Sequence, residues 1–272
     1  MSDIAIPATA TDTVPQYNVL RPFDAGFVGR LKHVTQTVSC PVHGEQQVVL
    51  IDWGSGFLPK ATCPVCEEEE SARERDAARR RRQEGVWQKR GIAREFFGAT
   101  VANYAVKTPA QKAARDAVRE LCEGKLQKVV LLGRNGVGKT HLACAAVKHL
   151  GGKIVTAFAL ALRIRMTYAK GANESELDVL DELARLPFLA IDELGRGKNS
   201  DAVKDWLSYV LDRRHSEGLP FMICTNAHLA ADCPEGGCDG CFENLVGSDV
   251  LSRLQQSSRI VSLAGVKDWR GK

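Results

Sequence analysis

The sequence predicts an α/β fold in which a parallel sheet is flanked by helices, preceded by a small cysteine-containing domain. Three observations support this prediction. Short apolar segments alternate with helical patterns from about residue 91 onward, a glycine-rich motif follows the first of these segments, and two pairs of Cys/His residues come before them. Alternation of strand and helix is typical of parallel sheets, whose strands are buried on both faces.

Composition divides the 272 residues into four segments. Residues 1–35 show no sustained periodicity and are expected to be a partly disordered lead-in. The first Cys/His cluster lies in residues 36–66, and residues 67–90 are dense in charge and in helix-forming residues, as expected of a solvated helical linker. Residues 91–272 form the α/β domain. Five apolar runs in this domain predict a five-stranded sheet: KVVLLG (128–133), KIVTA (153–157), FLAID (188–192), FMICT (221–225) and RIVSL (259–263).

Residues 133–140, GRNGVGKT, match the pattern G-x-x-x-x-G-K-[ST] completely, between a predicted strand and a predicted helix. Glycines let successive backbone N–H groups face one concavity, and the following helix N-terminus favours the same anion. Lys139 would bind the β- and γ-phosphates of ATP, and the Thr140 hydroxyl would be a ligand of Mg²⁺. The expected nucleotide-binding residues are Gly133, Arg134, Asn135, Gly136, Val137, Gly138, Lys139 and Thr140.

Polar residues at the ends of two later strands complete this predicted site. Asp192 and Glu193 follow the apolar run LPFLAI, so Asp192 is expected beside Mg²⁺ and Glu193 is placed to polarise a water for attack on the γ-phosphate. Asn226 follows the strand FMICT, between the first two strand ends, and is a candidate for orienting that water; the alternative is an ordinary turn-forming asparagine.

These residues together resemble the AAA+ ATPases, in particular the DnaC-type helicase loaders and the related IstB-type transposition helpers. The resemblance covers roughly residues 90–272. It rests on REFFGATVANY, GRNGVGKTHLACAA, FLAIDELGRGKNSDAVKDWLSYVLDRRHSEGLPFMICTN and VLSRLQQSSRIVSLAGVKDWR. It implies an AAA+ P-loop domain without a full C-terminal lid.

The resemblance also implies two arginine roles. Arg253 in SRL matches the arginine finger that reaches the γ-phosphate bound to a neighbouring subunit, and Arg270 in DWR matches the sensor arginine that contacts the nucleotide in cis. A finger supplied in trans makes hydrolysis depend on assembly, so a homo-oligomer that forms on ATP binding, head to tail, is expected.

Nine cysteines in a long chain without a secretion signal favour metal ligation over disulfides. Cys40-Pro-Val-His43 and Cys63-Pro-Val-Cys66 give C-x₂-H and C-x₂-C pairs, which can hold Zn²⁺ tetrahedrally in a structural site. In some of the resembled loaders an N-terminal zinc module docks on the helicase, which makes residues 36–66 the expected partner-recognition domain.

A second cluster, Cys233, Cys238 and Cys241, lies between Asn226 and Arg253 and departs from the family pattern. Three cysteines leave a tetrahedron incomplete, and His228 is one candidate for the fourth ligand. Another cysteine, an exchangeable water, a redox role and the absence of metal remain open. The other three cysteines, Cys122, Cys144 and Cys224, fit small buried hydrophobes.

The formal net charge of +4 permits a nucleic-acid partner without requiring one. The basic run Arg79–Arg82 could contact DNA phosphates or form a solvated helix face balanced by Glu67–Glu70. In the resembled family the AAA+ domain contacts single-stranded DNA, which makes Arg163, Arg165 and Lys170 candidates.

The leading expectation is an ATP-dependent loader of a hexameric, replicative DnaB-type helicase onto single-stranded DNA, with ATP, Mg²⁺ and Zn²⁺ as cofactors. An IstB-type transposition helper that binds duplex DNA is the alternative, and a non-hydrolysing adaptor is a third possibility. The apolar runs are too short to cross a bilayer and the N-terminus lacks a signal pattern, so no membrane association and a cytoplasmic location are expected.

Overall fold

The computed structural model describes residues 32–52, 60–195, 201–235, 237–256 and 258–268. The chain forms two compact units, Met1–Arg79 and Arg80–Lys272, and the division falls within helix α1 (Pro64–Lys89). Among the described residues, every helix is too short or too polar to cross a lipid bilayer.

The first unit contains an antiparallel hairpin of β1 (Lys32–Cys40) and β2 (Gly44–Asp52), in which Cys40 pairs with Gly44 next to the turn. Gly44 has a φ of +72°, which a residue without a side chain adopts readily. The hairpin begins at Lys32, four residues before the boundary predicted for this domain. The physical reason is that Cys40 is the last residue of β1 and His43 lies in the turn, so the hairpin includes the strand that leads to this Cys/His pair.

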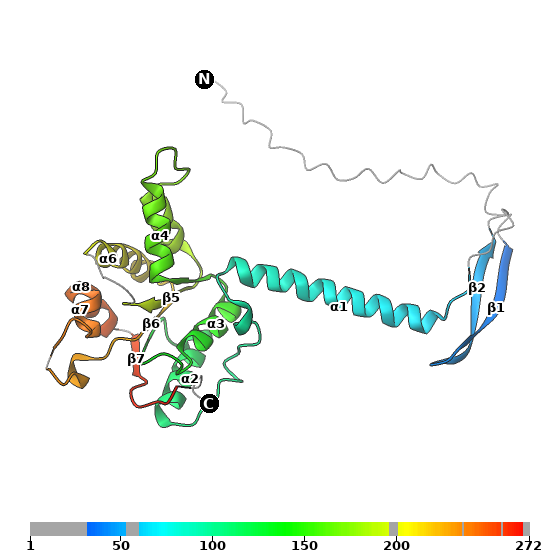
Figure 1. Ribbon diagram of the computed structural model, residues 1–272, viewed down its shortest axis with the longest axis horizontal. Coiled ribbons are helices and arrows are strands. Elements are labelled where there is room, and N and C mark those ends of the chain that lie inside the picture. Colours follow the sequence, from blue (N-terminus) through cyan, green and yellow to red (C-terminus); the bar gives the residue numbers. More distant parts are fainter. Residues whose placement is uncertain (1–31, 53–59, 196–200, 236, 257, 269–272) are drawn as a thin grey trace, which may run out of the picture. The chain divides into compact units, whose positions relative to one another are not determined.

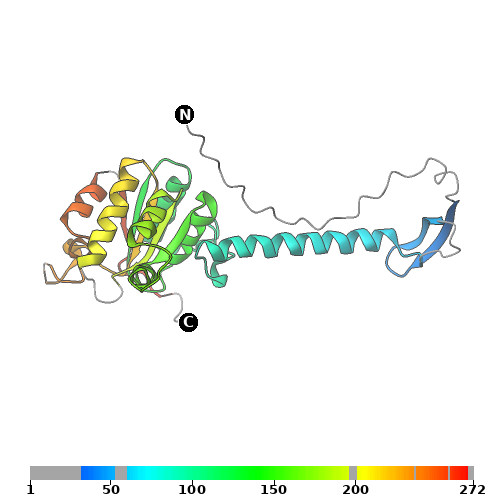
Figure 2. The same cartoon turned by 90° about the horizontal axis from the view of Figure 1, so that it is seen from above.

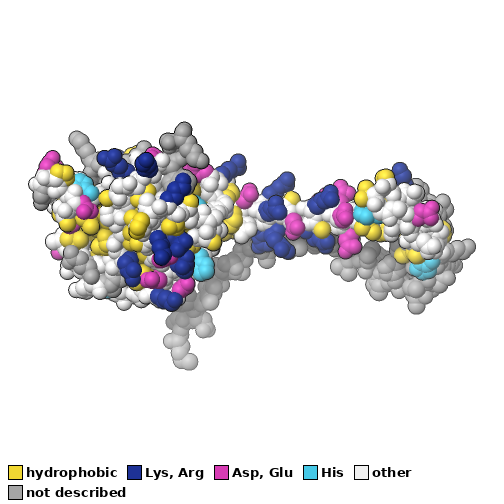
Figure 3. All heavy atoms as spheres, turned by 90° about the horizontal axis from the view of Figure 1, so that it is seen from below, with side chains coloured by type: hydrophobic (Ala, Val, Ile, Leu, Met, Phe, Trp, Pro, Cys, Tyr) yellow, Lys and Arg dark blue, Asp and Glu magenta, His cyan; other side chains and the backbone are white. Residues whose placement is uncertain are grey.

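Helix α1 has 26 residues, none of which is buried. Most of the helix is polar on every side, as expected of a helix surrounded by solvent. Trp87 near its C-terminus is the exception, since it packs partly buried against the apolar cluster of the second unit. Acidic side chains gather at the hairpin end of α1 and basic ones farther along, as Figure 3 shows. The basic run Arg79–Arg82 lies on this helix and is exposed throughout.

The second unit contains a five-stranded parallel sheet in the order β4-β5-β6-β3-β7 (Figures 1 and 2). The predicted five-stranded parallel sheet is confirmed. The strands are β3 (Lys128–Leu132), β4 (Lys153–Thr156), β5 (Leu189–Leu194), β6 (Phe221–Thr225) and β7 (Ser258–Ser262).

Helices cover both faces of this sheet because successive side chains of a strand point to opposite sides. Val129 and Leu131 of β3 pack in one apolar cluster with α2 and α3, whereas Val130 and Leu132 pack in a second cluster with α4 to α8. The helices are α2 (Pro109–Cys122), α3 (Lys139–Leu150), α4 (Ala157–Thr167), α5 (Glu176–Arg185), α6 (Asp201–Ser216), α7 (Phe242–Val246) and α8 (Ser248–Gln255), with short 3₁₀ turns η2 (Arg94–Phe96) and η3 (Ala230–Asp232).

The strand order determines where a ligand can bind. Strand β6 lies between β5 and β3, so the residues that follow these three strands meet at the carboxyl ends of the strands. In open parallel sheets, ligands bind in the crevice at the carboxyl ends of the strands. Three parts of the chain lie there: the glycine-rich loop after β3, the acidic pair at the end of β5, and Asn226 after β6.

Candidate nucleotide-binding site

The loop between β3 and α3 has the backbone of a phosphate cradle. Gly133, Gly136 and Gly138 have φ values of 147°, 77° and 93°, which favour glycine. At Gly138 a Cβ atom would lie 2.5 Å from Cε2 of Tyr104, so a side chain there would be both strained and obstructed. The N-terminus of α3 follows directly and directs its N–H groups into the loop.

Lys139, the first residue of α3, is only 6% exposed and its amine lies at the mouth of the loop. The Nζ atom donates to the carbonyl oxygens of Gly133 and Arg134 at 2.6 and 2.9 Å, and to Oδ1 of Asn226 at 2.9 Å. The Asn226 amide in turn donates to Oδ1 of Asn135 at 2.9 Å. The cation and the polar side chain after β6 are therefore joined where the phosphates would lie.

Thr140 and Asp192 bring two oxygen ligands together. The Thr140 hydroxyl donates to Oδ2 of Asp192 at 2.8 Å. Burial raises the pKa of Asp192, while hydrogen bonds from Thr140 and from the backbone N–H of Glu193 act in the opposite direction. A hydroxyl and a carboxylate at this spacing beside a phosphate loop are the hard oxygen donors that Mg²⁺ prefers, so these residues fit the expected ion.

Glu193 has an unusual backbone. It is the one non-glycine residue with positive φ in the described part of the chain, at 54°. The pairing of β5 with β6 shifts register between Ile191 and Leu194, and resumes where the Thr225 hydroxyl donates to the Leu194 carbonyl at 2.7 Å. Bulges and strained residues of this kind concentrate at functional sites, where they redirect a side chain. The bulge is also the reason that β5 extends beyond its predicted end at Asp192.

These groups line one pocket of about 400 Å³, a volume suited to a small-molecule ligand. Its lining residues are Phe96, Asn103, Tyr104, Ala105, Asn135, Gly136, Gly138, Lys139, Thr140, His141, Asp192, Glu193 and Asn226. The Tyr104 hydroxyl donates to the carbonyl of Val137 at 2.9 Å, and Nε2 of His141 lies 3.0 Å from Oδ1 of Asn103.

Sequence reasoning did not assign five of these residues to the site: Phe96, Asn103, Tyr104, Ala105 and His141. Four of them belong to residues 94–105, ahead of the first strand of the sheet, and line the pocket together with the phosphate loop. The signal was the aromatic run REFFGATVANY, which precedes a phosphate loop and supplies rings without forming a strand or a long helix.

Arg253 lies near the amino-terminal ends of the strands, whereas the pocket lies at their carboxyl ends. Its helix α8 ends just before β7, and its backbone carbonyl accepts from Nζ of Lys128, the first residue of β3. A strand of five residues spans about 16 Å, and the phosphate loop follows the other end of β3. The Arg253 guanidinium pairs with Asp212 of α6 at 2.8 Å. The structure thus does not bring Arg253 to this chain's own pocket. Arg270 lies outside the described residues.

The first Cys/His cluster comes together in the hairpin unit. The ligand atoms of Cys40, His43, Cys63 and Cys66 all lie within 4.8 Å of one another. Nδ1 of His43 is 3.3 Å from the Cys66 sulfur, while its Nε2 is 3.5 Å from Oε1 of Glu69. A carboxylate behind a metal-binding imidazole is the usual arrangement around zinc. Backbone N–H groups of His43 and Val42 lower the pKa of Cys40 to about 6, which favours the thiolate that zinc binds.

The second cluster also comes together, and it includes the histidine that was one of its candidates. The ligand atoms of His228, Cys233, Cys238 and Cys241 lie within 4.8 Å of one another in the second unit. The remaining cysteines behave differently. Cys144 and Cys224 are buried in the apolar layer under α3, where burial raises their thiol pKa values, and Cys122 packs against the same layer.

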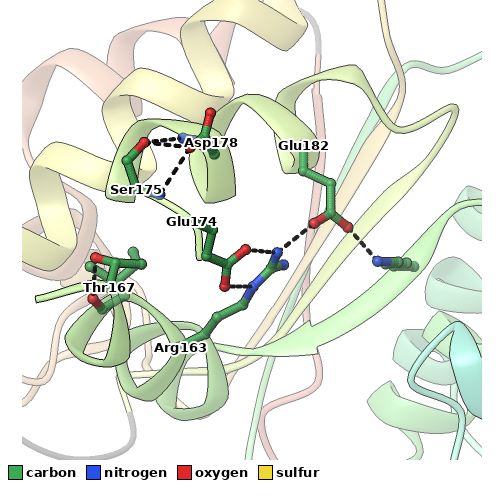
Figure 4. Close-up of polar contacts among 8 residues, drawn as sticks. Arg163, Thr167, Glu174, Ser175, Asp178 and Glu182 are labelled. Carbon is green, nitrogen blue, oxygen red and sulfur yellow. Dashed lines mark hydrogen bonds and ion pairs between the residues drawn. The ribbon is translucent and has the colours of Figure 1, made fainter. Parts of the chain in front are cut away.

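The candidate DNA-binding cations differ in their surroundings. Arg163 is held by two carboxylates, with Nη2 at 2.6 Å from Glu174 and 2.7 Å from Glu182, as Figure 4 shows. Its charge is therefore already compensated within the fold. Arg165 and Lys170 are exposed and remain candidates.

Comparison with known proteins decides the family. Residues 70–265 match the model of the IstB-like ATP binding proteins. This chain belongs to the IstB-like ATP binding protein family. The match includes the phosphate loop, the acidic pair and Arg253, and it begins after the first Cys/His cluster. The predicted resemblance is confirmed, and ATP binding follows from family membership.

Relatives of this IstB-like protein include the replicative helicase loader DnaC of Escherichia coli strain K12, which is 27% identical over 190 residues, covering 67% of this chain and 73% of that protein. The loader DnaC of Buchnera aphidicola subsp. Schizaphis graminum is 29% identical over 173 residues, covering 61% and 66%. A crystal structure of the DnaC helicase loader shares the fold, with a TM-score of 0.52 and 23% identity over 62% of this chain and 99% of that one.

Proposed function

We propose that this chain is an ATP-dependent loader that places a hexameric, DnaB-type replicative helicase on single-stranded DNA in the cytoplasm. The observation that carries the proposal is its relationship, over two thirds of its length, to proteins named replicative helicase loaders. The geometry of the pocket supports the chemical part of the proposal, because Lys139, Thr140, Asp192 and Glu193 line one cavity.

In this proposal the loop residues 133–140 bind the phosphates of ATP and Lys139 compensates their charge. Thr140 and Asp192 would hold Mg²⁺, which when bound neutralises charge on the phosphates. Glu193 accepts a proton from a water, whose oxygen then attacks the γ-phosphorus while the bond to ADP breaks. Asn226, which already contacts the Lys139 amine, orients that water. The strained backbone of Glu193 favours hydrolysis over a non-hydrolysing adaptor, which would not require it.

Arg253 is proposed to act on the ATP of a neighbouring subunit. The pocket lies at the carboxyl ends of the strands and the arginine near their amino-terminal ends. A subunit with these two groups at opposite ends is suited to a head-to-tail assembly. In the isolated chain Arg253 pairs with Asp212, so assembly would exchange this partner for a γ-phosphate. Coupling hydrolysis to assembly in this way would let the loader release its helicase only when the complex is complete.

The hairpin unit is proposed to be the zinc-dependent helicase-docking module. The donor set of Cys40, His43, Cys63 and Cys66 fits zinc, since all four positions of a tetrahedron are filled by protein. A two-stranded hairpin alone is marginally stable in water, so a bound ion would supply the stability that a core does not. The four ligands of this unit lie before the family match, which begins at residue 70, and this position suits a part that determines the partner rather than the ATPase chemistry.

The second candidate function is that of an IstB-type transposition helper, which the family description favours. Both candidates share the ATPase and differ in what the ATP-bound assembly holds. The experiment mixes the chain with the replicative helicase of the same source, ATP and a circular single-stranded DNA, and measures helicase bound to the circle. The loader predicts ATP-dependent transfer of helicase to the DNA. No transfer, together with ATP-dependent binding to duplex DNA, would support the transposition helper instead.

A further inference from the structure

The segment between β6 and α7 contains four metal-ligating side chains that the proposed function does not use. His228 Nε2 lies 3.5 Å from the sulfur of Cys238 and 3.5 Å from that of Cys241, and the two sulfurs are 3.9 Å apart. Cys233 completes a group whose ligand atoms all lie within 4.8 Å of one another.

These distances match the edges of a zinc tetrahedron. Bonds of about 2.3 Å to sulfur and about 2.0 Å to nitrogen place two sulfurs about 3.8 Å apart and a sulfur about 3.5 Å from the imidazole nitrogen. All three thiols are free, and 3.9 Å is far from the roughly 2.05 Å of a disulfide. Thiols that meet without bonding, together with one imidazole, form the donor set of a structural zinc site.

The backbone around the cluster is arranged for the same geometry. The N–H of Cys238 donates to the sulfur of Cys241 at 3.3 Å, and the N–H of Cys241 donates to the carbonyl of Cys238 at 3.0 Å. The carbonyl of His228 accepts from the N–H of Phe242 at 2.8 Å, which brings the start of the segment to the start of α7. Cys241 itself is fully buried. The four ligands therefore approach one point from three places along the segment.

We propose that His228, Cys233, Cys238 and Cys241 bind a structural zinc ion in the ATPase unit. All four tetrahedral positions are filled by protein, which leaves none for a substrate and indicates a structural rather than a catalytic ion. Apart from the 3₁₀ turn η3, the described residues between β6 and α7 form no helix or strand, so a bound ion would add local order that regular structure does not supply.

The position of this ion suggests what it stabilises. His228 comes two residues after Asn226, and Cys241 directly precedes α7, which packs against α8 with Arg253. The ion would thus cross-link the chain between the end of β6, at the pocket, and the helices α7 and α8, the second of which carries Arg253. Resting on the proposed function, we infer that it couples Asn226 to the orientation of Arg253 in the assembly.

Zinc content tests the site itself. Variants of the full chain are purified, dialysed and analysed for metal by mass spectrometry. In a Cys63→Ser/Cys66→Ser background, which removes the first cluster, the proposal predicts about one zinc per chain. Adding Cys238→Ser and Cys241→Ser should reduce this to about zero. A background variant without zinc, or a count that the added substitutions leave unchanged, would overturn the second site whatever the first one does.

A measurement on the unaltered chain protects this test against variants that fail to fold. A mercurial reagent titrates the thiols while a coloured chelator reports the zinc that is released. Two sites predict two zinc ions per chain, and replacement by Co²⁺ should give intense thiolate-to-cobalt absorption from both. One ion released, in step with the thiols of the hairpin unit only, would contradict the proposal.

The coupling is tested separately by ATP turnover. In an otherwise unaltered chain, Cys238→Ser/Cys241→Ser should bind a fluorescent ATP analogue as tightly as the parent chain, while turnover in the assembly falls several-fold. Loss of zinc with unchanged turnover would overturn the coupling and leave the metal site standing. A variant of the first cluster serves as the control, because its zinc lies outside the ATPase unit.

Discussion

Glu193 is the residue on which the proposed chemistry depends most. Its backbone is in the left-handed region at φ 54°, and the bulge around it separates it from the ladder between β5 and β6. An L-residue with a side chain adopts this conformation at a cost of about 1–3 kcal/mol, which the surrounding sheet must offset. The adjacent Asp192 is tied to Thr140 and to the backbone N–H of Glu193. In the proposed mechanism the Asp192 carboxylate serves the ion and the Glu193 carboxylate serves the water.

We expect Glu193→Gln to bind ATP with unchanged affinity and to lose about 10²–10⁴-fold in turnover, because the amide cannot accept the proton from water. Steady-state phosphate release and equilibrium binding of an ATP analogue measure the two quantities. Asn226→Ala is the comparison, with a smaller loss expected. Turnover that survives Glu193→Gln would remove this residue from the role of base.

The proposed role of Arg253 in a neighbouring subunit can be tested by mixing two inactive variants of the chain. Arg253→Ala should lower turnover by roughly 10³-fold, the contribution usual for an arginine finger. Mixing these subunits with Lys139→Ala subunits should restore part of the activity, because each kind supplies what the other lacks at a shared site. Phosphate release as a function of mixing ratio is the measurement.

Asp212→Asn is the matched control for this experiment. It breaks the ion pair that Arg253 makes within the chain and keeps the guanidinium, so turnover should be retained. If mixtures of the two inactive variants stay inactive at every ratio, the finger does not act in trans.

At the scale of residues, the sequence predicted those whose chemistry is tied to a motif. The phosphate loop, the acidic pair and Asn226 stand where strand ends place them, and the structure brings them together. The sequence could not predict that Asp212 pairs with Arg253, since that contact joins α6 to α8 across the fold. The place of Tyr104 against Gly138 is likewise a tertiary contact without a local pattern.

Among the elements, α4 and α5 are joined to the edge strand β4 by ion pairs. Arg163 of α4 pairs with Glu174 and with Glu182 of α5, and Glu182 also pairs with Lys153 of β4 (Figure 4). Burial alone would raise the pKa of Glu182, but hydrogen bonds from Lys153 and Arg163 outweigh it, and the pKa is lowered. This network fixes the edge of the sheet next to β5, which carries Asp192.

We expect Glu182→Gln to lower the free energy of unfolding by about 1 kcal/mol at neutral pH, since two half-exposed ion pairs are lost. The lowered pKa means that the stabilisation is present above the unfolded-state pKa of about 4.3 and disappears as pH falls through the folded-state value. Urea unfolding at neutral and acidic pH measures the difference. An exposed residue of α1 provides the control, Glu68→Gln. An undiminished difference in acid would contradict the ionic origin.

The accuracy with which the sequence predicted strand positions differs between the two units, and the difference has a physical reason. Buried strands such as β3 and β6 read as short apolar runs, so their positions were predicted to within about a residue. The hairpin strand β1, KHVTQTVSC, is mostly polar, because a two-stranded unit has little core to face. Its start at Lys32 therefore has no signal in the sequence, whereas the cysteine pairs that its turn carries were recognisable by spacing.

At the scale of the whole molecule, the chain joins an α/β unit of the IstB-like ATP binding family to a Cys/His cluster that the family match does not include. The match begins at residue 70, after Cys40, His43, Cys63 and Cys66. The strand–helix alternation determined the fold of the second unit, since a parallel sheet requires crossover helices. No comparable rule predicts what the hairpin unit binds, because neither a fold nor a set of Cys/His ligands specifies a partner.

The most direct test of the loader is size-exclusion chromatography of the full chain with the replicative helicase of the same source. In ATP and magnesium the two proteins should elute together. The variant Cys63→Ser/Cys66→Ser loses two of the four ligands of the proposed docking module and leaves the second unit unaltered. It should bind ATP and elute apart from the helicase. Separate elution of the unaltered chain under every nucleotide condition would contradict the loader.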